Sequence, residues 1–325
     1  MAVQRPTPVF IVGNGRSGTT ITASLLNRLP GVQIAKETGY IGLSVSMLEQ
    51  IDAPGVLPRM IVDTNSWLER ERWQHRASVD GYRAFCDQHG VHGAEGFMHY
   101  VWQLDSQVAW SEQNWIGDNT PLYIMAIPAI MKLLPDAHFI HVVRDPRDVA
   151  CSIVRMKFGA EDLVAATLEW HANIGAWFMA ERTVPPEHRR EIRYEDLCTD
   201  SLATLTKLAE FLGCTRDDAA TALAAQAGGT TKSAEGFTDV AGMEHHKRLS
   251  ESIGPSRVGR FRSELSPAQI RAIEAIAQYG MSAYGYPLDE WQASPWMKGD
   301  RKALLAAHVR DMTRRVWKRL KSIGK

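Results

Sequence analysis

Residues 8–20 read PVFIVGNGRSGTT, a short apolar run followed at once by a glycine-rich loop. Gly13 and Gly18 have the spacing of a phosphate-binding loop, G-x-x-x-x-G-K-S/T, but Thr19 stands where that pattern has its lysine. The basic residue lies upstream instead, at Arg16. A glycine loop between a strand and a helix presents backbone N–H groups and the positive helix end to an anion. We therefore expect an anion-binding loop that differs from the loop of an ordinary nucleoside triphosphatase.

Short apolar runs alternate with helical patterns along the rest of the chain. The loop is followed by helically spaced apolar residues as far as Leu29, and then by the short run VQIA at 32–35. A strand, a glycine loop, a helix and a second strand open a doubly wound α/β fold. Further strands are expected at WIGD (115–118), HFIHVV (138–143) and REIRYEDL (190–197), and helices at 123–133, 162–181, twice within 202–227, and from Ser266 onward. The expected fold is a P-loop-like three-layer α/β sandwich with a central parallel sheet.

The composition is that of an ordinary soluble globular enzyme. Of 325 residues, 45% are hydrophobic and 23% charged, and the formal net charge is zero, which gives no sign of a nucleic-acid partner. No window of about 18 residues is free of charge, so we expect no membrane span and a cytoplasmic protein. We expect one domain over residues 1–300, with a helical insertion at about 39–115 that caps the sheet. Its tryptophans would form helix-packing core or, as the alternative, line an acceptor site.

Residues 301–325 form a basic segment with an apolar stripe at helical spacing. This pattern predicts a basic amphipathic C-terminal helix. Such a helix can lie on an anionic membrane, complete a homodimer, or pack on the body of its own protein.

A second group of polar residues lies in VVRDPRDVACS, at 142–152. Arg144 follows a predicted buried strand, at the edge where open α/β sheets bind ligands. Ser152 lies eight residues further along the chain, near the second turn of the next helix. An arginine and a hydroxyl that converge there could bind a second phosphate group, in addition to the one in the glycine loop.

Four stretches together resemble the sulfotransferases that use 3′-phosphoadenosine 5′-phosphosulfate (PAPS). They are RSGTT (16–20), RDPRDVACS (144–152), IRYEDL (192–197) and VGRFRSEL (258–265), in family order within roughly residues 8–290. The resemblance implies that the loop binds the 5′-phosphosulfate and the second stretch the 3′-phosphate. The nucleotide-binding residues that it implies are Arg16, Ser17, Gly18, Thr19, Thr20, Arg144, Ser152, Tyr194, Arg257 and Arg260. Tyr194 could instead shape its turn, and Arg155 is a further candidate.

The loop looks closest to that of the tyrosylprotein and carbohydrate sulfotransferases and their bacterial relatives. The tyrosylprotein enzymes carry a glutamate base in a Glu-Thr pair about 21 residues after the loop arginine, and here that position holds Glu37, followed by Thr38. The resemblance thus implies that Glu37 is the general base and that Arg16 stabilises the leaving group. The alternative is a surface glutamate at a strand end. His92 and His99 are rival bases, since cytosolic members of the family use a histidine.

One position departs from the family pattern. Members often have a lysine before the Thr-Pro or Asp-Pro that precedes the second motif, and here Asn119 takes its place, in GDNTP. The expected activity is metal-independent transfer of a sulfuryl group from PAPS to a hydroxyl of a small-molecule, lipid-linked or peptide acceptor. The alternatives are a nucleotide-binding protein without transfer activity and a phosphotransferase that depends on a nucleoside triphosphate.

Overall fold

A computed structural model describes residues 5–38, 47–70, 76–105, 110–154, 162–227 and 254–288. The C-terminal helix expected at 301–325 and the candidate Arg155 lie outside these segments. The long loop that the composition predicts at 228–256 also lies outside them, apart from its last three residues.

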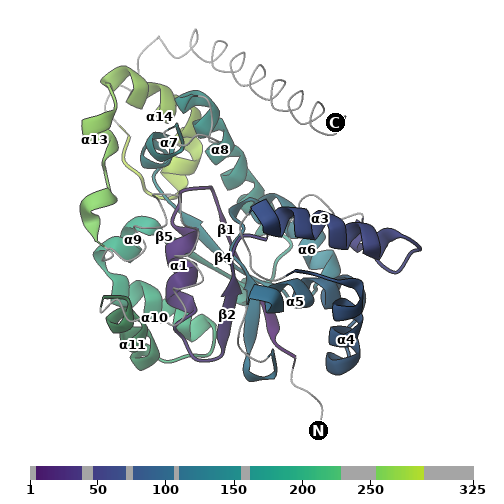
Figure 1. The fold of residues 1–325 in the computed structure, drawn as a ribbon. Coiled ribbons are helices and arrows are strands. Elements are labelled where there is room, and N and C mark those ends of the chain that lie inside the picture. The colour runs from purple at the N-terminus through teal and green to yellow at the C-terminus, as the bar shows by residue number, and fades with distance from the viewer. Residues whose placement is uncertain are drawn as a thin grey trace.

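Five parallel strands form the central sheet (Figure 1). In spatial order they are β2 (Val32–Ala35), β3 (Trp115–Asp118), β1 (Thr7–Gly13), β4 (His138–Val143) and β5 (Arg189–Arg193). The register sets Ala35 and Phe10 on either side of Asp118. All five strands point the same way, so their carboxyl ends meet at one edge of the sheet. That edge is where ligands of open α/β sheets bind.

Alternate side chains of β1 face opposite layers, as the strand period requires. Val9 and Ile11 pack toward α1 (Thr19–Leu26), α9 (Tyr194–Thr199), α10 (Ser201–Phe211) and α11 (Arg216–Ala227). Phe10 and Val12 pack toward α3 (Val56–Arg70), α4 (Val79–His89), α5 (Gly93–Asp105) and α6 (Ile127–Leu133). The three-layer α/β sandwich expected from the sequence is therefore confirmed.

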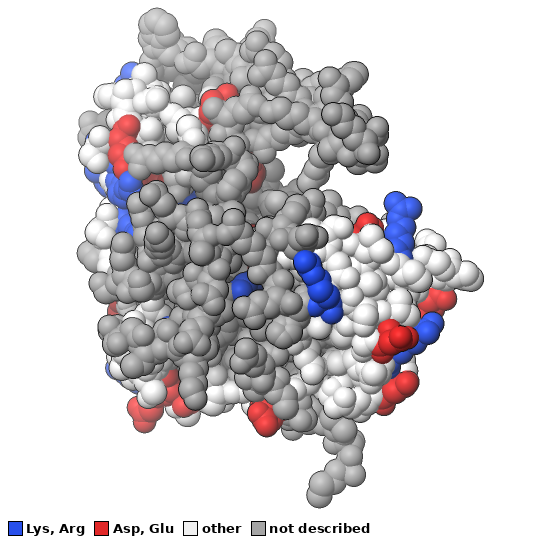
Figure 2. Space-filling model, in the orientation of Figure 1, with Lys and Arg blue, Asp and Glu red and all other residues white. Residues whose placement is uncertain are grey.

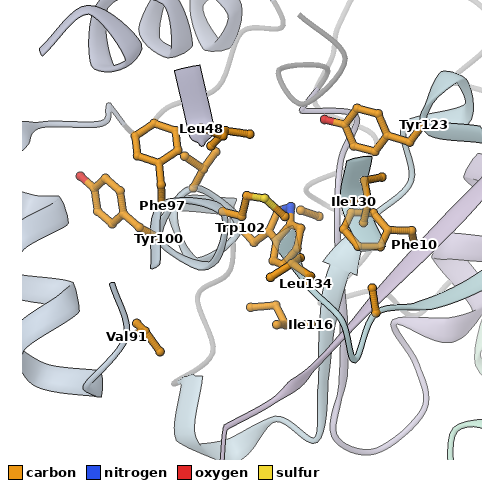
Figure 3. Packing of buried hydrophobic residues seen from close by; sticks show 14 of the residues in the cluster. Phe10, Leu48, Val91, Phe97, Tyr100, Trp102, Ile116, Tyr123, Ile130 and Leu134 are labelled. Carbon is orange, nitrogen blue, oxygen red and sulfur yellow. The ribbon is translucent and has the colours of Figure 1, made fainter. Parts of the chain in front are cut away.

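The described part of the chain between β2 and β3 is mainly helical, and two of its tryptophans are core residues. Trp102 and Trp110 are fully buried in the cluster that also contains Phe10 and Tyr123 (Figure 3). These two tryptophans therefore pack the helices against the sheet. On the surface, much of the described area over these helices is uncharged, with some Lys, Arg, Asp and Glu side chains, several of them close together, at its margin (Figure 2).

A third group of helices packs against the C-terminal end of β4. It consists of α7 (Pro146–Val154), α8 (Leu163–Ala180) and α14 (Pro267–Ala283), which share a buried cluster, together with the short α13 (Phe261–Glu264). A capping box is present at the start of α14, between Ser266 and Gln269. None of the helices in the described segments is both long and apolar enough to cross a membrane.

Two elements differ from the sequence-based expectation. The strand expected over 190–197 ends at Arg193, and Tyr194 begins α9. The two acidic residues of that first turn favour a helix start, because they complement the positive helix end. The helix expected over 123–133 divides into a 3₁₀ turn, η2 (Pro121–Ala126), and α6. Pro128 at the start of α6 separates the two, since proline has no N–H to continue a preceding helix.

Candidate functional site

The glycine loop has a shape that only glycine allows at two positions. Gly13 and Gly18 have φ angles of 157° and 102°. A Cβ on Gly18 would lie 2.4 Å from the Tyr194 ring, and one on Gly13 would lie 2.5 Å from the Val142 carbonyl oxygen. The loop therefore packs directly on the residues that follow β5 and on β4. Gly18 precedes α1, so the N-terminus of this helix faces the loop as the sequence predicts.

Arg16 is the only non-glycine residue of the described chain with a positive φ, at 72°. This left-handed backbone costs about 1–2 kcal/mol for an ordinary residue. Two contacts hold it in place. Its carbonyl accepts a hydrogen bond from Arg144 at 3.1 Å, and its Nε donates to Ser152 Oγ at 3.1 Å. The structure thus brings the loop and the second motif together, as the sequence predicts.

Arg144 connects the parts of this site. Its guanidinium also donates to the Arg257 carbonyl at 2.7 Å and lies 4.3 Å from the centroid of the Tyr194 ring. The side chain is buried, and within the described segments its Nε has no hydrogen-bond partner. The same is true of the Ser17 hydroxyl, which is fully buried in the loop. Both groups are available to a ligand.

Positive charge accumulates around the loop. Burial lowers the pKa of Arg16, and the nearby charges of Arg144 and Arg257 lower it further. Glu37 and Tyr194 act in the opposite direction. Three arginines from distant parts of the sequence thus lie close enough to repel one another, with Glu37 as the acidic group near Arg16. An anion bound among them would relieve this repulsion.

The second motif also contains residues whose role the sequence analysis missed. Arg147 is buried and donates to Asp145 at 2.6 and 2.9 Å and to Glu274 at 2.6 Å. The Asp145 carboxylate also accepts the Arg147 N–H, which makes Asp145 the N-cap of α7. Burial alone would lower the pKa of Arg147, but these carboxylates raise it. The arginine therefore fastens α14 to the start of α7 and belongs to the scaffold.

Asp148 ties the C-terminal segment to the site. Its two carboxylate oxygens accept the backbone N–H groups of Gly259 at 2.7 Å and Phe261 at 3.0 Å. Arg257 is thereby held beside Arg144. By contrast, the guanidinium of Arg260 is engaged by Glu264 at 2.6 and 3.0 Å. Of the two predicted arginines in this segment, Arg257 is the one that contributes charge at the loop.

Glu37 follows β2 and is exposed, whereas the next residue, Thr38, is fully buried. The Thr38 hydroxyl donates to Asp118, at the end of β3. Asp118 also accepts from the Thr120 N–H at 2.6 Å and from Trp102 Nε1 at 3.4 Å. Asn119 is buried beside it, and neither atom of its amide has a partner among the described residues.

The remaining candidates differ in their surroundings. Thr19, the first residue of α1, is buried, and Thr20 is half-buried on the same helix. His99 is fully buried, accepts from Trp110 Nε1 at 3.4 Å, and has its pKa lowered by burial to about 3. It is a core residue and not a solvent-accessible base. His92 is exposed in the turn before α5. Among the described residues, no group of three or more His, Cys, Asp or Glu side chains could hold a metal.

Known proteins resemble this chain in sequence and in structure. The model of the Sulfotransferase family matches residues 8–218. Protein-tyrosine sulfotransferase A of Caenorhabditis elegans is 24% identical over 222 residues, 65% of this chain and 50% of that protein, so the chain spans about half of the relative's length.

Solved sulfotransferase domains superpose on this chain at low sequence identity. The sulfotransferase domain of the Synechococcus PCC 7002 olefin synthase superposes with a TM-score of 0.61 at 22% identity, covering 88% of this chain and 97% of that domain. The sulfotransferase domain from the curacin biosynthetic pathway superposes with a TM-score of 0.47 at 18% identity, covering 88% of this chain and 100% of that domain.

The buried Asp118 makes stability depend on pH. Burial raises its pKa to about 6, although hydrogen bonds from Thr120, Thr38 and Trp102 oppose the shift. An unfolded chain releases this proton near pH 4, at about the model-peptide value. Between about pH 4 and pH 6 the folded protein therefore holds a proton that the unfolded chain has lost. The stability should fall as the pH rises through this window, by up to about 3 kcal/mol from this group, and level off above it.

The Asp118→Asn variant lacks this contribution. The free energy of unfolding of the variant, measured relative to wild type by urea denaturation, should therefore increase from pH 4 to pH 6. The exposed Asp87→Asn serves as the control, with a difference that stays nearly constant. A pH-independent difference for Asp118→Asn would show that the carboxyl group is not buried as described.

Proposed function

The chain belongs to the sulfotransferase family, and we propose that it moves a sulfuryl group from PAPS to a hydroxyl group of an acceptor. The observation that carries the proposal is the convergence of Arg16, Arg144 and Arg257 around the glycine loop. Like charges repel, so this arrangement favours a ligand that brings several negative charges. The two phosphate positions of PAPS supply them.

The polar groups of the site fit such a ligand. The buried Ser17 hydroxyl and the Arg144 Nε–H have no partner within the described segments. A buried polar group left in this state costs about 1–3 kcal/mol, and phosphate oxygens accept from both. We propose that the loop and Ser17 hold the 5′-phosphosulfate, and that Arg144, Arg257 and Ser152 hold the 3′-phosphate. PAPS supplies the activated sulfuryl group.

Proton transfer is assigned to Glu37 and charge stabilisation to Arg16. Glu37 accepts the proton of the acceptor hydroxyl while the acceptor oxygen bonds to sulfur. The bond between sulfur and the 5′-phosphate oxygen breaks, and negative charge builds on that oxygen. Arg16, the loop N–H groups and the N-terminus of α1 stabilise this charge, with each donor contributing about 3 kcal/mol. Catalysis of this kind depends mainly on positioning and electrostatics.

The acceptor is proposed only as a class, an alcohol or phenol. The C. elegans relative is named for transfer to protein tyrosine, which makes a peptide tyrosine one option. A small-molecule or lipid-linked hydroxyl is the other. Asn119, which stands in place of the family's lysine, also favours a second function, a nucleotide-binding protein without transfer activity.

Replacing Arg144 with Ala should weaken binding of 3′-phosphoadenosine 5′-phosphate (PAP) by at least about 30-fold, because a buried charged hydrogen-bonding partner is lost. AMP lacks the 3′-phosphate, so its binding should weaken by a smaller factor than that of PAP, through the lost contact between Arg144 and the glycine loop alone. Calorimetric titration of both ligands and of ATP with magnesium measures this, with the exposed Arg190→Ala as the control. Preference of the wild type for ATP with magnesium would contradict the proposed function.

Replacing Glu37 with Gln should slow sulfuryl transfer by about 100- to 10,000-fold, the usual contribution of a general base. Affinity for PAP should not change, since the loop is intact. The rate is that of sulfate release from PAPS, with water standing in for the acceptor, and of transfer to phenol or a tyrosine peptide. The exposed Glu210→Gln is the control. An unaltered rate for Glu37→Gln would assign the base elsewhere.

Replacing Asn119 with Ala should weaken binding of PAPS about tenfold and leave binding of PAP unchanged, if its amide donates to a sulfuryl oxygen. The two ligands differ only in the sulfuryl group, so their ratio isolates this contact. The exposed Asn114→Ala is the control. Equal affinities of the variant and wild type for PAPS, together with no sulfate release by the wild type, would support the nucleotide-binding alternative.

A further inference from the structure

Thr38 and Asp118 belong to a buried hydrogen-bonded group directly behind Glu37. The Thr38 hydroxyl contacts Asp118 Oδ2 and lies 3.0 Å from the Tyr123 hydroxyl. An ionised carboxylate can only accept, so Thr38 donates to Asp118. Tyr123 must then donate to Thr38. The Asp118 carboxylate thus sets the direction of both hydrogen bonds that the Thr38 hydroxyl makes.

Asp118 accepts hydrogen bonds from three donors in different parts of the fold. Besides Thr38, which follows β2, it accepts from Trp102 on α5 and from the Thr120 backbone before η2. Tyr123, on η2, is connected to it through Thr38. Trp102 and Tyr123 are themselves fixed in the aromatic core (Figure 3). The group therefore joins the exit of β2 to rigid parts of the molecule.

Burying a carboxyl group to make this connection costs free energy. Asp118 is fully buried, and burial raises its pKa to about 6, so its charged form is disfavoured by the surroundings. A buried ionised group is often no more stabilising than well-packed apolar side chains of the same volume. A gain in stability therefore does not explain the aspartate at this position. The three donors that its carboxylate orients beside Glu37 explain it better.

The neighbouring group is Glu37, which precedes Thr38 in the chain and feels the charge of Arg16. The Glu37 side chain is exposed, whereas Thr38 is buried. We propose that Thr38 and Asp118 are positioning residues that fix the backbone of Glu37 so that its carboxylate stays beside Arg16. This inference rests on the proposed function only in naming Glu37 as the base.

Two substitutions at Thr38 separate the hydroxyl from the methyl group. Thr38→Val keeps the shape and removes the hydroxyl, whereas Thr38→Ser keeps the hydroxyl. In Thr38→Val, hydrogen exchange of the backbone amides at residues 36–38 should become at least tenfold faster, measured on the protein without added nucleotide. Exchange in β3 and in the glycine loop should not change. Thr38→Ser should remain close to wild type, and the buried Thr204→Val in α10 is the control.

The same variants are then tested for function. Thr38→Val should slow sulfate release from PAPS at least tenfold while the affinity for PAP stays within about twofold of wild type. Thr38→Ser should restore most of the rate. In the Glu37→Gln background, Thr38→Val should cause no further loss, because residues that act through one group are not additive.

Unchanged exchange at residues 36–38, or an equal loss of rate in both backgrounds, would overturn the inference. Failure of the proposed function has a different signature. PAP would not bind, or Glu37→Gln would release sulfate as fast as wild type, even though exchange at 36–38 still responded to Thr38→Val. That combination would show that Thr38 and Asp118 fix the backbone at Glu37 and that this has no role in catalysis.

Discussion

The guanidinium of Arg144 holds three separate segments together at the carboxyl edge of the sheet. It donates to the carbonyl of Arg16 in the glycine loop and to that of Arg257 in the C-terminal segment, and it stacks on Tyr194 after β5. A planar group with several fixed donors suits this task in a way that lysine would not. The geometry of the anion site therefore depends on one side chain that is itself expected to contact the ligand.

The charges of the site are arranged before any ligand binds. Bringing Arg16, Arg144 and Arg257 together costs free energy, which the scaffold has to supply. Part of it comes from the buried contacts of Asp145, Arg147 and Glu274, which hold the neighbouring helices together. A site organised in this way loses little on reorganisation when charge develops in the reaction, which is the main source of electrostatic catalysis.

Local patterns were enough to predict the strands, the glycine loop and the placement of Arg144, because each depends on residues close in sequence. The contact between Arg16 and Ser152 could also be predicted, because both residues follow strands that end at the same edge of the sheet. Arg147 could not be recognised as scaffold, because its partner Glu274 is 127 residues away on a helix face. The hydrogen bond between Thr38 and Asp118 was missed for the same reason, because the two residues are 80 positions apart. A charged residue at the end of a buried strand, Asp118, was its one signal.

The contacts of the second motif bear on where the folding unit ends. The family match stops at residue 218, yet Arg147 and Asp148 take their partners from residues 259–287. A fragment cut at the end of the match would keep all five strands, but Arg147 would lose the Glu274 carboxylate and Asp148 would lose two backbone N–H donors. Buried charged groups that lose hydrogen-bond partners destabilise a folded protein. The smallest autonomous piece of this protein therefore has to include α14, whose amino acids make no contribution to the sheet.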